Sequence, residues 1–322
     1  MLKEQRSTFR TSFVRLILRN IRKFDCSGYS RPYLNIGHTG LNDVGFRQWL
    51  SDTGVAPIYF VHDLIPITHP NFCRRGEADR HRERMRTVLT TASGIIGNSQ
   101  ATLDDLHHFA RKEGLPTPPG IAVWLGVPRL RPPPLQNSNQ GQPTFVSVGT
   151  IEARKNHLLL LKLWTRFIDR LKEKAPRLLI VGRRGWEADE VFTLLDREKH
   201  LNGHVVEMNG CTDEELARHL SSARALLFPS YAEGFGLPLV EALDLGVPVI
   251  ASDLPVFREI GQGVPTFVGP TDEAAWETAV LDFARENSAE RAAQLERVQQ
   301  FRSPSWDVHF SKVERWLEGL AL

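Results

Sequence analysis

The sequence predicts an α/β protein with two domains, each built on a parallel β-sheet that helices cover on both faces. Short, continuously apolar segments alternate with amphipathic helical segments along most of the chain, and this alternation is typical of parallel sheets buried between helices. A length of 322 residues fits two domains of about 150 residues each. Between the two halves, residues 131–143 (RPPPLQNSNQGQP) have the composition of an extended linker.

The first half is expected to alternate strand and helix from residue 56 onward. Its expected elements are a buried strand at Ile58–Val61, a helix in 77–93, a short strand in 94–99 (GIIGNS) and a helix in 99–114 (SQATLDDLHHFARKEG). The last of these has a clear start signal, because a serine or threonine hydroxyl ahead of acidic residues can cap the first N–H groups of a helix.

The second half repeats the alternation more regularly. The expected strands are 143–150, 177–182, 204–210, 225–230 and 248–252, and the expected helices are 157–174, 189–200, 213–223 and 238–246. The loops that carry charged or glycine residues all follow strands. Because ligands of parallel sheets bind at the carboxyl ends of the strands, one edge of this domain is expected to hold the functional residues.

Composition and charge narrow the range of functions. The formal net charge of +2 is too small to favour nucleic acid as a partner. The three cysteines, Cys26, Cys73 and Cys211, are far apart and show no CxxC spacing, which fits a reducing cytoplasm better than a disulfide framework or a metal site. No apolar run reaches the roughly 18 residues that a membrane span needs.

Residues 1–24 form a basic amphipathic segment. They hold seven Lys or Arg residues and one acid, Glu4, and their apolar residues recur at helical spacing. Such a helix can lie on an anionic membrane surface, but the pattern also fits an ordinary domain helix with a solvated basic face. Arginines interrupt the apolar region, so the segment is not a secretory signal. The expected location is the cytoplasm, either free or in peripheral contact with the inner face of the plasma membrane.

Two glutamates lie beside a predicted anion-binding site in FPSYAEGFGLPLVEALDLGVPVIAS. Pro238 suits the first turn of a helix, and Gly234 and Gly236 let the preceding backbone turn sharply. The free N–H groups and the dipole at such a helix start suit a diphosphate. Glu233 and Glu241 would repel that anion unless each had its own partner, and sugar hydroxyls are suitable partners. Taken alone, the two glutamates also fit a solvent-facing loop and a plain helix start.

A second loop, GTIEARKNH, supplies positive charge. Arg154 and Lys155 would neutralise phosphate and stabilise the negative charge that grows on a departing diphosphate. An exposed Arg–Lys pair on a loop is the simpler alternative. Arg183 and Arg184, which follow RLLIVG, are expected to supply supporting charge only.

These motifs resemble those of a known family. FPSYAEGFGLPLVEALDLGVPVIAS, with Glu233 and Glu241 separated by seven residues, closely resembles the signature of the retaining glycosyltransferases grouped as family 4. VGTIEARKNH is similar to the phosphate loop of that family. HDLIPITHPNFCRRGEADRH and GIIGNSQATLDDL are similar to its amino-terminal domain, especially in bacterial polysaccharide and lipopolysaccharide members of the mannosyltransferase type. The likeness covers roughly residues 33–320, and the motifs in this order are highly specific.

The resemblance implies a GT-B fold, in which two Rossmann-like domains face each other across a cleft and no metal ion is required. It places an N-terminal acceptor-side domain at 1–137, a C-terminal nucleotide-sugar domain at 138–300, and a helix at 301–322 that packs back on the first domain. Family members have a further strand, glycine-containing loop and helix before the equivalent of YLNIGHTGL, so the N-terminal domain is expected to be incomplete.

The resemblance also assigns the donor sugar and the ribose. Glu233 would contact the donor sugar, assisted by the backbone amides of Gly234, Phe235 and Gly236. Glu241 would bind the ribose hydroxyls of the nucleotide.

The diphosphate and the base have their own expected contacts. Arg154 and Lys155 would hold the diphosphate, and His62 would reach the donor sugar from the opposite domain. Backbone groups around Met208 and Gly210 would contact the base.

Three further positions complete the expected site. Gly149 and Leu237 belong to the same donor site by resemblance. Asp63 is expected to orient or cap its neighbours rather than to act as a general base, because no nucleophile is paired with it. For His62, a satisfied structural histidine after a buried strand is the alternative.

The implied reaction needs no cofactor beyond its donor substrate, GDP-mannose or a UDP-sugar. The acceptor would be a glycan or a lipid-linked acceptor of the cell surface. Its hydroxyl would attack the donor sugar on the same face that the diphosphate leaves, so that the configuration is retained. The main alternative is an inactive, donor-binding remnant with an interaction role. A nicotinamide-dependent oxidoreductase is disfavoured, because no GxGxxG follows a predicted strand.

Overall fold

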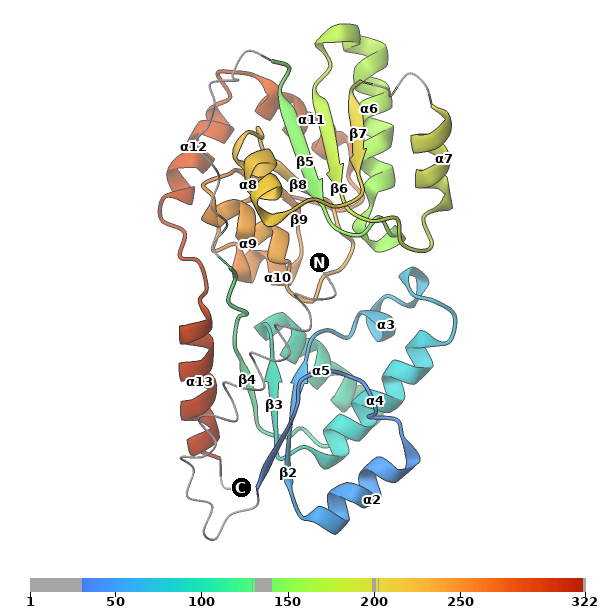
Figure 1. Ribbon diagram of the computed structural model, residues 1–322, viewed down its shortest axis with the longest axis vertical. Coiled ribbons are helices and arrows are strands. Elements are labelled where there is room, and N and C mark those ends of the chain that lie inside the picture. The colour runs from blue at the N-terminus through green and yellow to red at the C-terminus, as the bar shows by residue number, and fades with distance from the viewer. Residues whose placement is uncertain (1–30, 129, 131–140, 199–200, 202, 321–322) are drawn as a thin grey trace.

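The computed structural model contains two α/β units, placed one above the other in Figure 1, and each has its own parallel sheet. The residues described are 31–128, 130, 141–198, 201 and 203–320. The basic helix predicted in 1–24 and most of the predicted linker lie outside the described residues.

The N-terminal unit has a four-stranded parallel sheet in the order β1-β2-β3-β4. Its strands are β1 (Pro32–Asn35), β2 (Ala56–Val61), β3 (Gly94–Gly97) and β4 (Gly120–Ala122). Its helices are α2 (Val44–Thr53), α3 (Ile65–Thr68), α4 (Glu77–Thr91) and α5 (Gln100–Glu113), with a 3₁₀ turn, η1 (Pro70–Phe72), after α3.

The C-terminal unit has a six-stranded parallel sheet in the order β10-β9-β8-β5-β6-β7. Its strands are β5 (Thr144–Val148), β6 (Arg177–Val181), β7 (Val205–Met208), β8 (Leu226–Phe228), β9 (Val249–Ser252) and β10 (Thr266–Val268). Its helices are α6 (His157–Leu171), α7 (Asp189–Arg197), α8 (Asp213–Ser221), α9 (Leu237–Asp244), α10 (Pro255–Ile260), α11 (Glu273–Ala284) and α12 (Ala289–Val298), with 3₁₀ turns η2 (Ala153–Lys155) and η3 (Lys172–Lys174).

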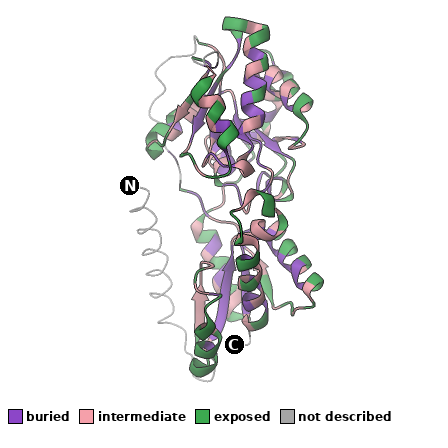
Figure 2. Ribbon diagram, turned by 90° about the vertical axis from the view of Figure 1, so that its right-hand side faces the viewer, coloured by how far each residue is buried: buried purple, intermediate pink, exposed green. Residues whose placement is uncertain are grey.

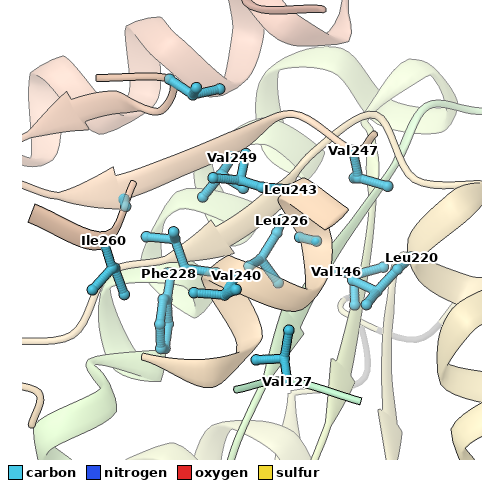
Figure 3. Close-up of a cluster of buried hydrophobic side chains, with 14 of the residues drawn as sticks. Val127, Val146, Leu220, Leu226, Phe228, Val240, Leu243, Val247, Val249 and Ile260 are labelled. Atoms are coloured by element: carbon cyan, nitrogen blue, oxygen red, sulfur yellow. The ribbon is translucent and has the colours of Figure 1, made fainter. Parts of the chain in front are cut away.

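Both faces of the six-stranded sheet carry an apolar core. Successive side chains of a strand point to opposite faces, so Val146 of β5 joins one buried cluster and Phe145 joins the other. Figure 3 shows the first cluster, in which Val240 and Leu243 of α9 lie against the sheet. Strands buried on both faces explain why these segments are continuously apolar in the sequence. In Figure 2 the strands are mostly buried, and exposed residues gather on the outer sides of the helices.

The last helix, α13 (Trp306–Glu318), leaves the C-terminal unit and runs beside the N-terminal one (Figure 1). Its Val313 belongs to a buried cluster with Ile58 and Phe60 of β2, and Trp316 packs against the same cluster. The contact with β3 is close, because a Cβ added at Gly94 would lie 2.6 Å from the Trp316 ring. This helix therefore covers the face of the first sheet that is opposite α4 and α5.

The predicted alternation is confirmed from residue 56 onward, including the helix cap at Ser99, whose side chain accepts a hydrogen bond from the Thr102 N–H. The helix predicted in 157–174 ends at Leu171, where Lys172 takes a positive φ of 53°. The short strands β1, β4 and β10 were not predicted, whereas β3 and β8, which are equally short, were. None of the helices in the described ranges is long and apolar enough to cross a membrane.

Candidate functional site

The topology of the six-stranded sheet brings two loops together. The strand order reverses between β5 and β8, which are neighbours through the pair Val146 and Leu226. Ligands of open parallel sheets bind at such a reversal, outside the carboxyl ends of the strands. The loop after β5 carries Arg154, and the loop after β8 carries Tyr231, whose N–H donates to the Arg154 carbonyl at 2.9 Å. The two motifs that stood apart in the sequence are therefore one site.

Four charged side chains form a compact cluster at this point. Lys155 Nζ donates to Glu233 Oε1 at 2.5 Å, and Arg154 Nη1 lies 2.8 Å from Glu233 Oε2. The other end of the Arg154 guanidinium donates to Glu152 Oε1 at 2.6 Å. Ser230 Oγ also donates to Glu233 Oε1, at 2.8 Å. Each carboxylate of the cluster is paired, and Glu233 accepts from both cations.

Burial makes these pairings strong. The Glu233 side chain is only 8% exposed and that of Lys155 only 12%. Burial alone would raise the pKa of Glu233, but the charges of Lys155 and Arg154 outweigh it and hold that pKa below its usual value. Burial alone would lower the pKa of Arg154, but the negative charges of Glu233 and Glu152 outweigh it and raise that pKa. Both shifts favour the charged forms of Glu233 and Arg154.

Two glycines shape the backbone around the cluster. Gly149, directly after β5, has a φ of +143°, and a Cβ there would lie 3.3 Å from Lys155 Cε. Gly236 is the N-terminal cap of α9 with a φ of +104°, and a Cβ there would lie 2.7 Å from the Phe257 ring. The backbone conformation favours glycine at both positions, and at Gly236 the space also excludes a side chain.

The residues next to Gly236 differ in exposure. Phe235 is buried and belongs to the core below α9, whereas Leu237, the first residue of that helix, is 39% exposed. The loop therefore presents backbone and Leu237 outward while Phe235 anchors it.

Glu241 lies in the second turn of α9 and differs from Glu233 in its surroundings. No hydrogen-bond partner of its carboxyl group is found in the part of the chain that the structure describes. Burial, with a smaller contribution from the negative charge of Asp213 at the start of α8, raises the pKa of Glu241 to about 7. The influence of Asp213 shows that Glu241 is near the loop between β7 and α8. A half-buried carboxyl without an internal partner is a suitable hydrogen-bond acceptor for a ligand.

The loop between β7 and α8 contains the residues expected to contact a base. Gly210 is exposed, with a φ of +100°. The Met208 carbonyl already accepts two hydrogen bonds, from the N–H groups of Gly182 and Gly210, which uses both of its lone pairs. The Gly210 N–H is thus also engaged, and within this segment the Gly210 carbonyl is the more available group.

His62 faces this site from the N-terminal unit. It follows β2, and its carbonyl oxygen would overlap a Cβ at Gly234. Asn98, after β3, donates from Nδ2 to the same carbonyl at 2.8 Å. The His62 ring is 2.9 Å from the Ile36 carbonyl through Nε2. A carbonyl only accepts, so Nε2 carries a proton in this contact, and Nδ1 is the ring nitrogen that is left for another partner.

Asp63 has the capping role that the sequence predicted. Its Oδ1 accepts a hydrogen bond from the Ile65 N–H at 3.0 Å, at the start of α3.

Two further charged residues, Arg184 and Glu152, differ from what the sequence predicted. Arg184, expected to add supporting charge, is held by Asp196 and Glu207 at 2.6 and 2.7 Å, so its charge is neutralised there. Glu152 was missed by the sequence analysis although it lies two residues before Arg154 and is only 4% exposed. An acid in a loop is normally solvated, and only the fold shows that this one is buried against a guanidinium. Among the described residues, no three His, Cys, Asp or Glu side chains are grouped so that they could hold a metal ion.

Comparison with known proteins places the chain in a family. The family model described as "Glycosyl transferases group 1" matches residues 133–298, just over half of the 322 residues. The serotype-specific mannosyltransferase WbdA of Escherichia coli is 30% identical over 231 residues, 65% of this chain and 27% of that protein. The O-antigen chain mannosyltransferase B of Escherichia coli is 31% identical over 160 residues, 50% of this chain and 42% of that protein. The chain thus spans less than half the length of these relatives.

Solved structures show the same fold at low sequence identity. A sucrose-phosphate synthase from Thermosynechococcus elongatus superposes with a TM-score of 0.69 at 20% identity, over 96% of this chain and 77% of that one. WaaG, a glycosyltransferase involved in lipopolysaccharide biosynthesis, superposes with a TM-score of 0.63 at 15% identity, over 82% of this chain and 77% of that one. The predicted GT-B fold is confirmed. With the family match above, the chain belongs to the group 1 glycosyltransferases.

Proposed function

We propose that the protein is a retaining glycosyltransferase that moves a hexose from a nucleoside diphosphate sugar to a glycan or lipid-linked acceptor during cell-surface polysaccharide assembly. Mannose from GDP-mannose is the first choice of donor, since the relatives described above are named mannosyltransferases. Glucose from a UDP-sugar is the second.

The adjacency of Lys155, Arg154 and Glu233 is the observation that carries this proposal. In a sugar nucleotide the sugar is bonded directly to a phosphate, so a protein that recognises both must place cations beside an acceptor of hydroxyl hydrogen bonds. The 2.5 and 2.8 Å contacts of Glu233 with the two cations provide this juxtaposition. Arg154 and Lys155 would contact the diphosphate, and Glu233 would accept hydrogen bonds from the sugar.

The remaining groups extend the same site. Glu241 would bind the ribose hydroxyls, and the Gly210 backbone would contact the base. His62 would contact the sugar from the opposite unit, through Nδ1.

The chemistry follows from these positions. As the bond between the anomeric carbon and the phosphate oxygen breaks, the acceptor oxygen bonds to that carbon on the same face, and a phosphate oxygen takes the acceptor's proton. Arg154 and Lys155 stabilise the charge that develops on the departing diphosphate, and the two facing units hold acceptor and donor in place. Because side chains supply this positive charge, we expect activity to persist in the presence of a chelator.

The experiment is a transfer assay with purified full-length protein, a panel of nucleotide sugars and mannose-containing oligosaccharide or lipid-linked acceptors. Product would be detected by mass spectrometry and its anomeric configuration by NMR. Transfer with retained configuration is expected. Donor binding without any transfer across the panel would instead support the inactive, donor-binding alternative.

Location is a separate part of the proposal. We place the reaction in the cytoplasm, with residues 1–24 in contact with anionic lipid. Co-sedimentation with vesicles containing anionic lipid tests this, and equal binding to neutral vesicles would contradict it.

A further inference from the structure

One carboxylate joins the two units. Glu259 of α10 belongs to the C-terminal unit, yet its Oε1 accepts from the Gln100 N–H at 2.9 Å and its Oε2 from the Ala101 N–H at 3.1 Å. Gln100 and Ala101 are the first residues of α5 in the N-terminal unit. Oε1 also accepts from Trp124 Nε1 at 2.6 Å. In Figure 1, α10 lies at the lower end of the upper unit, facing α5.

These contacts complete the start of α5. The first N–H groups of a helix have no partner within the helix. In α5 the side chain of Ser99 accepts a hydrogen bond from the Thr102 N–H. The N–H groups of Gln100 and Ala101, at the start of the helix, donate to Glu259 instead. A carboxylate at this position is also favoured by the partial positive charge of the helix N-terminus. The N-terminal unit therefore has its helix cap supplied by the other unit.

The same end of α5 touches the proposed donor site. The hydroxyls of Ser99 and Thr102 lie 3.4 and 3.3 Å from the carbonyl oxygen of Gly234. Gly234 follows Glu233 and is in close contact with the His62 carbonyl. The start of α5 that Glu259 caps therefore also contacts the loop that carries Glu233, next to the backbone of His62.

We propose that Glu259 is a positioning residue that holds the two units in the arrangement in which Glu233 and His62 face the same sugar. Its effect on turnover depends on the proposed function, whereas its effect on the arrangement of the units does not. Arg258, the neighbouring residue, pairs with Asp253 inside the C-terminal unit and is 59% exposed, so it provides a matched control on the same helix.

The test compares Glu259→Ala and Glu259→Gln with Arg258→Ala and the wild type. Small-angle X-ray scattering of the full chain measures the separation of the units without reference to activity. We expect Glu259→Ala to increase the radius of gyration and to split thermal unfolding into two transitions. Glu259→Gln keeps one acceptor oxygen and should be intermediate, and Arg258→Ala should match the wild type.

The kinetic arm separates positioning from local damage. Glu259→Ala should lower kcat about tenfold or more, because small misplacements of reacting groups are costly. Its affinity for the nucleoside diphosphate should stay within about twofold, because that ligand is held by the C-terminal unit. Unchanged scattering and unfolding in Glu259→Ala would overturn the proposal, as would an equal loss of diphosphate affinity and turnover. If the wild type transfers no sugar, the proposed function fails, and scattering still decides the role of Glu259.

Discussion

Glu233 is held by two cations and a serine hydroxyl within a site that is almost fully buried. A buried carboxylate is tolerated only with such partners, and these partners are the groups expected to meet a diphosphate. Arg154, Lys155 and Glu233 could be singled out from the sequence because they lie in loops that follow predicted strands and match motifs of the family that the chain resembles. Glu152 could not, since its importance depends on burial that no local pattern reveals.

Removing Lys155 should abolish most of the turnover. In Lys155→Ala we expect kcat to fall by about 10²–10³, because one preorganised donor to the departing diphosphate is lost. Arg154 still pairs with Glu233 at 2.8 Å, so the fold should persist by circular dichroism. Lys162→Ala, at an exposed position of α6, is the control. Turnover equal to that of the control would refute the role given to Lys155.

Glu241 should make stability depend on pH. Its pKa of about 7 in the folded protein lies above the ordinary value of 4.5, so the folded state favours the protonated form, and stability is lost as pH rises through this range. Each pKa unit corresponds to about 1.4 kcal/mol, so the cost above pH 7 is on the order of 3 kcal/mol. Glu241→Gln removes the charge. Between pH 4.5 and 7 the free energy of unfolding of Glu241→Gln should rise relative to that of the wild type. Above pH 7 the difference between the two proteins should stay constant.

Chemical denaturation of both proteins across this pH range measures the difference. A difference that does not change with pH would show that Glu241 ionises normally. Donor affinity of Glu241→Gln should also be weaker if the carboxylate accepts from ribose hydroxyls.

At the level of elements, the start of α9 combines a buried anchor, a glycine cap and exposed backbone. The glycine-rich loop and Pro238 were sufficient to predict where this helix begins, since both act through local backbone conformation. The pairing of this loop with the one after β5 was predicted only as a shared sheet edge. The actual neighbours depend on strand order, which the sequence pattern does not contain.

Gly236 should not tolerate a side chain. Gly236→Ala combines a φ of +104° with a Cβ placed 2.7 Å from the Phe257 ring, so we expect a loss of about 1–3 kcal/mol and a weaker donor site. Gly246→Ala, after the other end of α9, has a φ of +75° but nothing within 4 Å, and separates backbone strain from crowding. Thermal melts and donor titrations measure both effects. Equal melting temperatures for the two variants would contradict the steric explanation.

At the level of the whole molecule, two units share one chain and are tied together by α10, α5 and the returning helix α13 (Figure 1). The alternation of elements predicted two sheets, and resemblance predicted that the last helix returns to the first unit. The contacts between the units, such as that of Glu259 with α5, join residues about 160 positions apart. No local sequence pattern can therefore predict them.

The packing of α13 should contribute to the stability of the N-terminal unit. Trp316→Ala removes a ring that lies against Gly94 and Ile58, and a loss of about 2–3 kcal/mol is expected for a partly buried aromatic residue. Val308→Ala, on the exposed side of the same helix at 54% exposure, is the control. Denaturant titration measures both, and equal stability of the two variants would show that α13 packs loosely.

The central claim is that the loops after β5 and β8 hold a sugar nucleotide, with cations on its diphosphate and Glu233 on its sugar. Calorimetric titration of GDP and GDP-mannose into the wild type, Lys155→Ala and Glu233→Gln tests it most directly, with UDP and UDP-glucose as the second pair. We predict that Lys155→Ala weakens both ligands, whereas Glu233→Gln weakens the sugar-bearing ligand relative to the diphosphate alone. Affinities that neither substitution alters, or that Glu233→Gln changes equally for both ligands, would contradict the account.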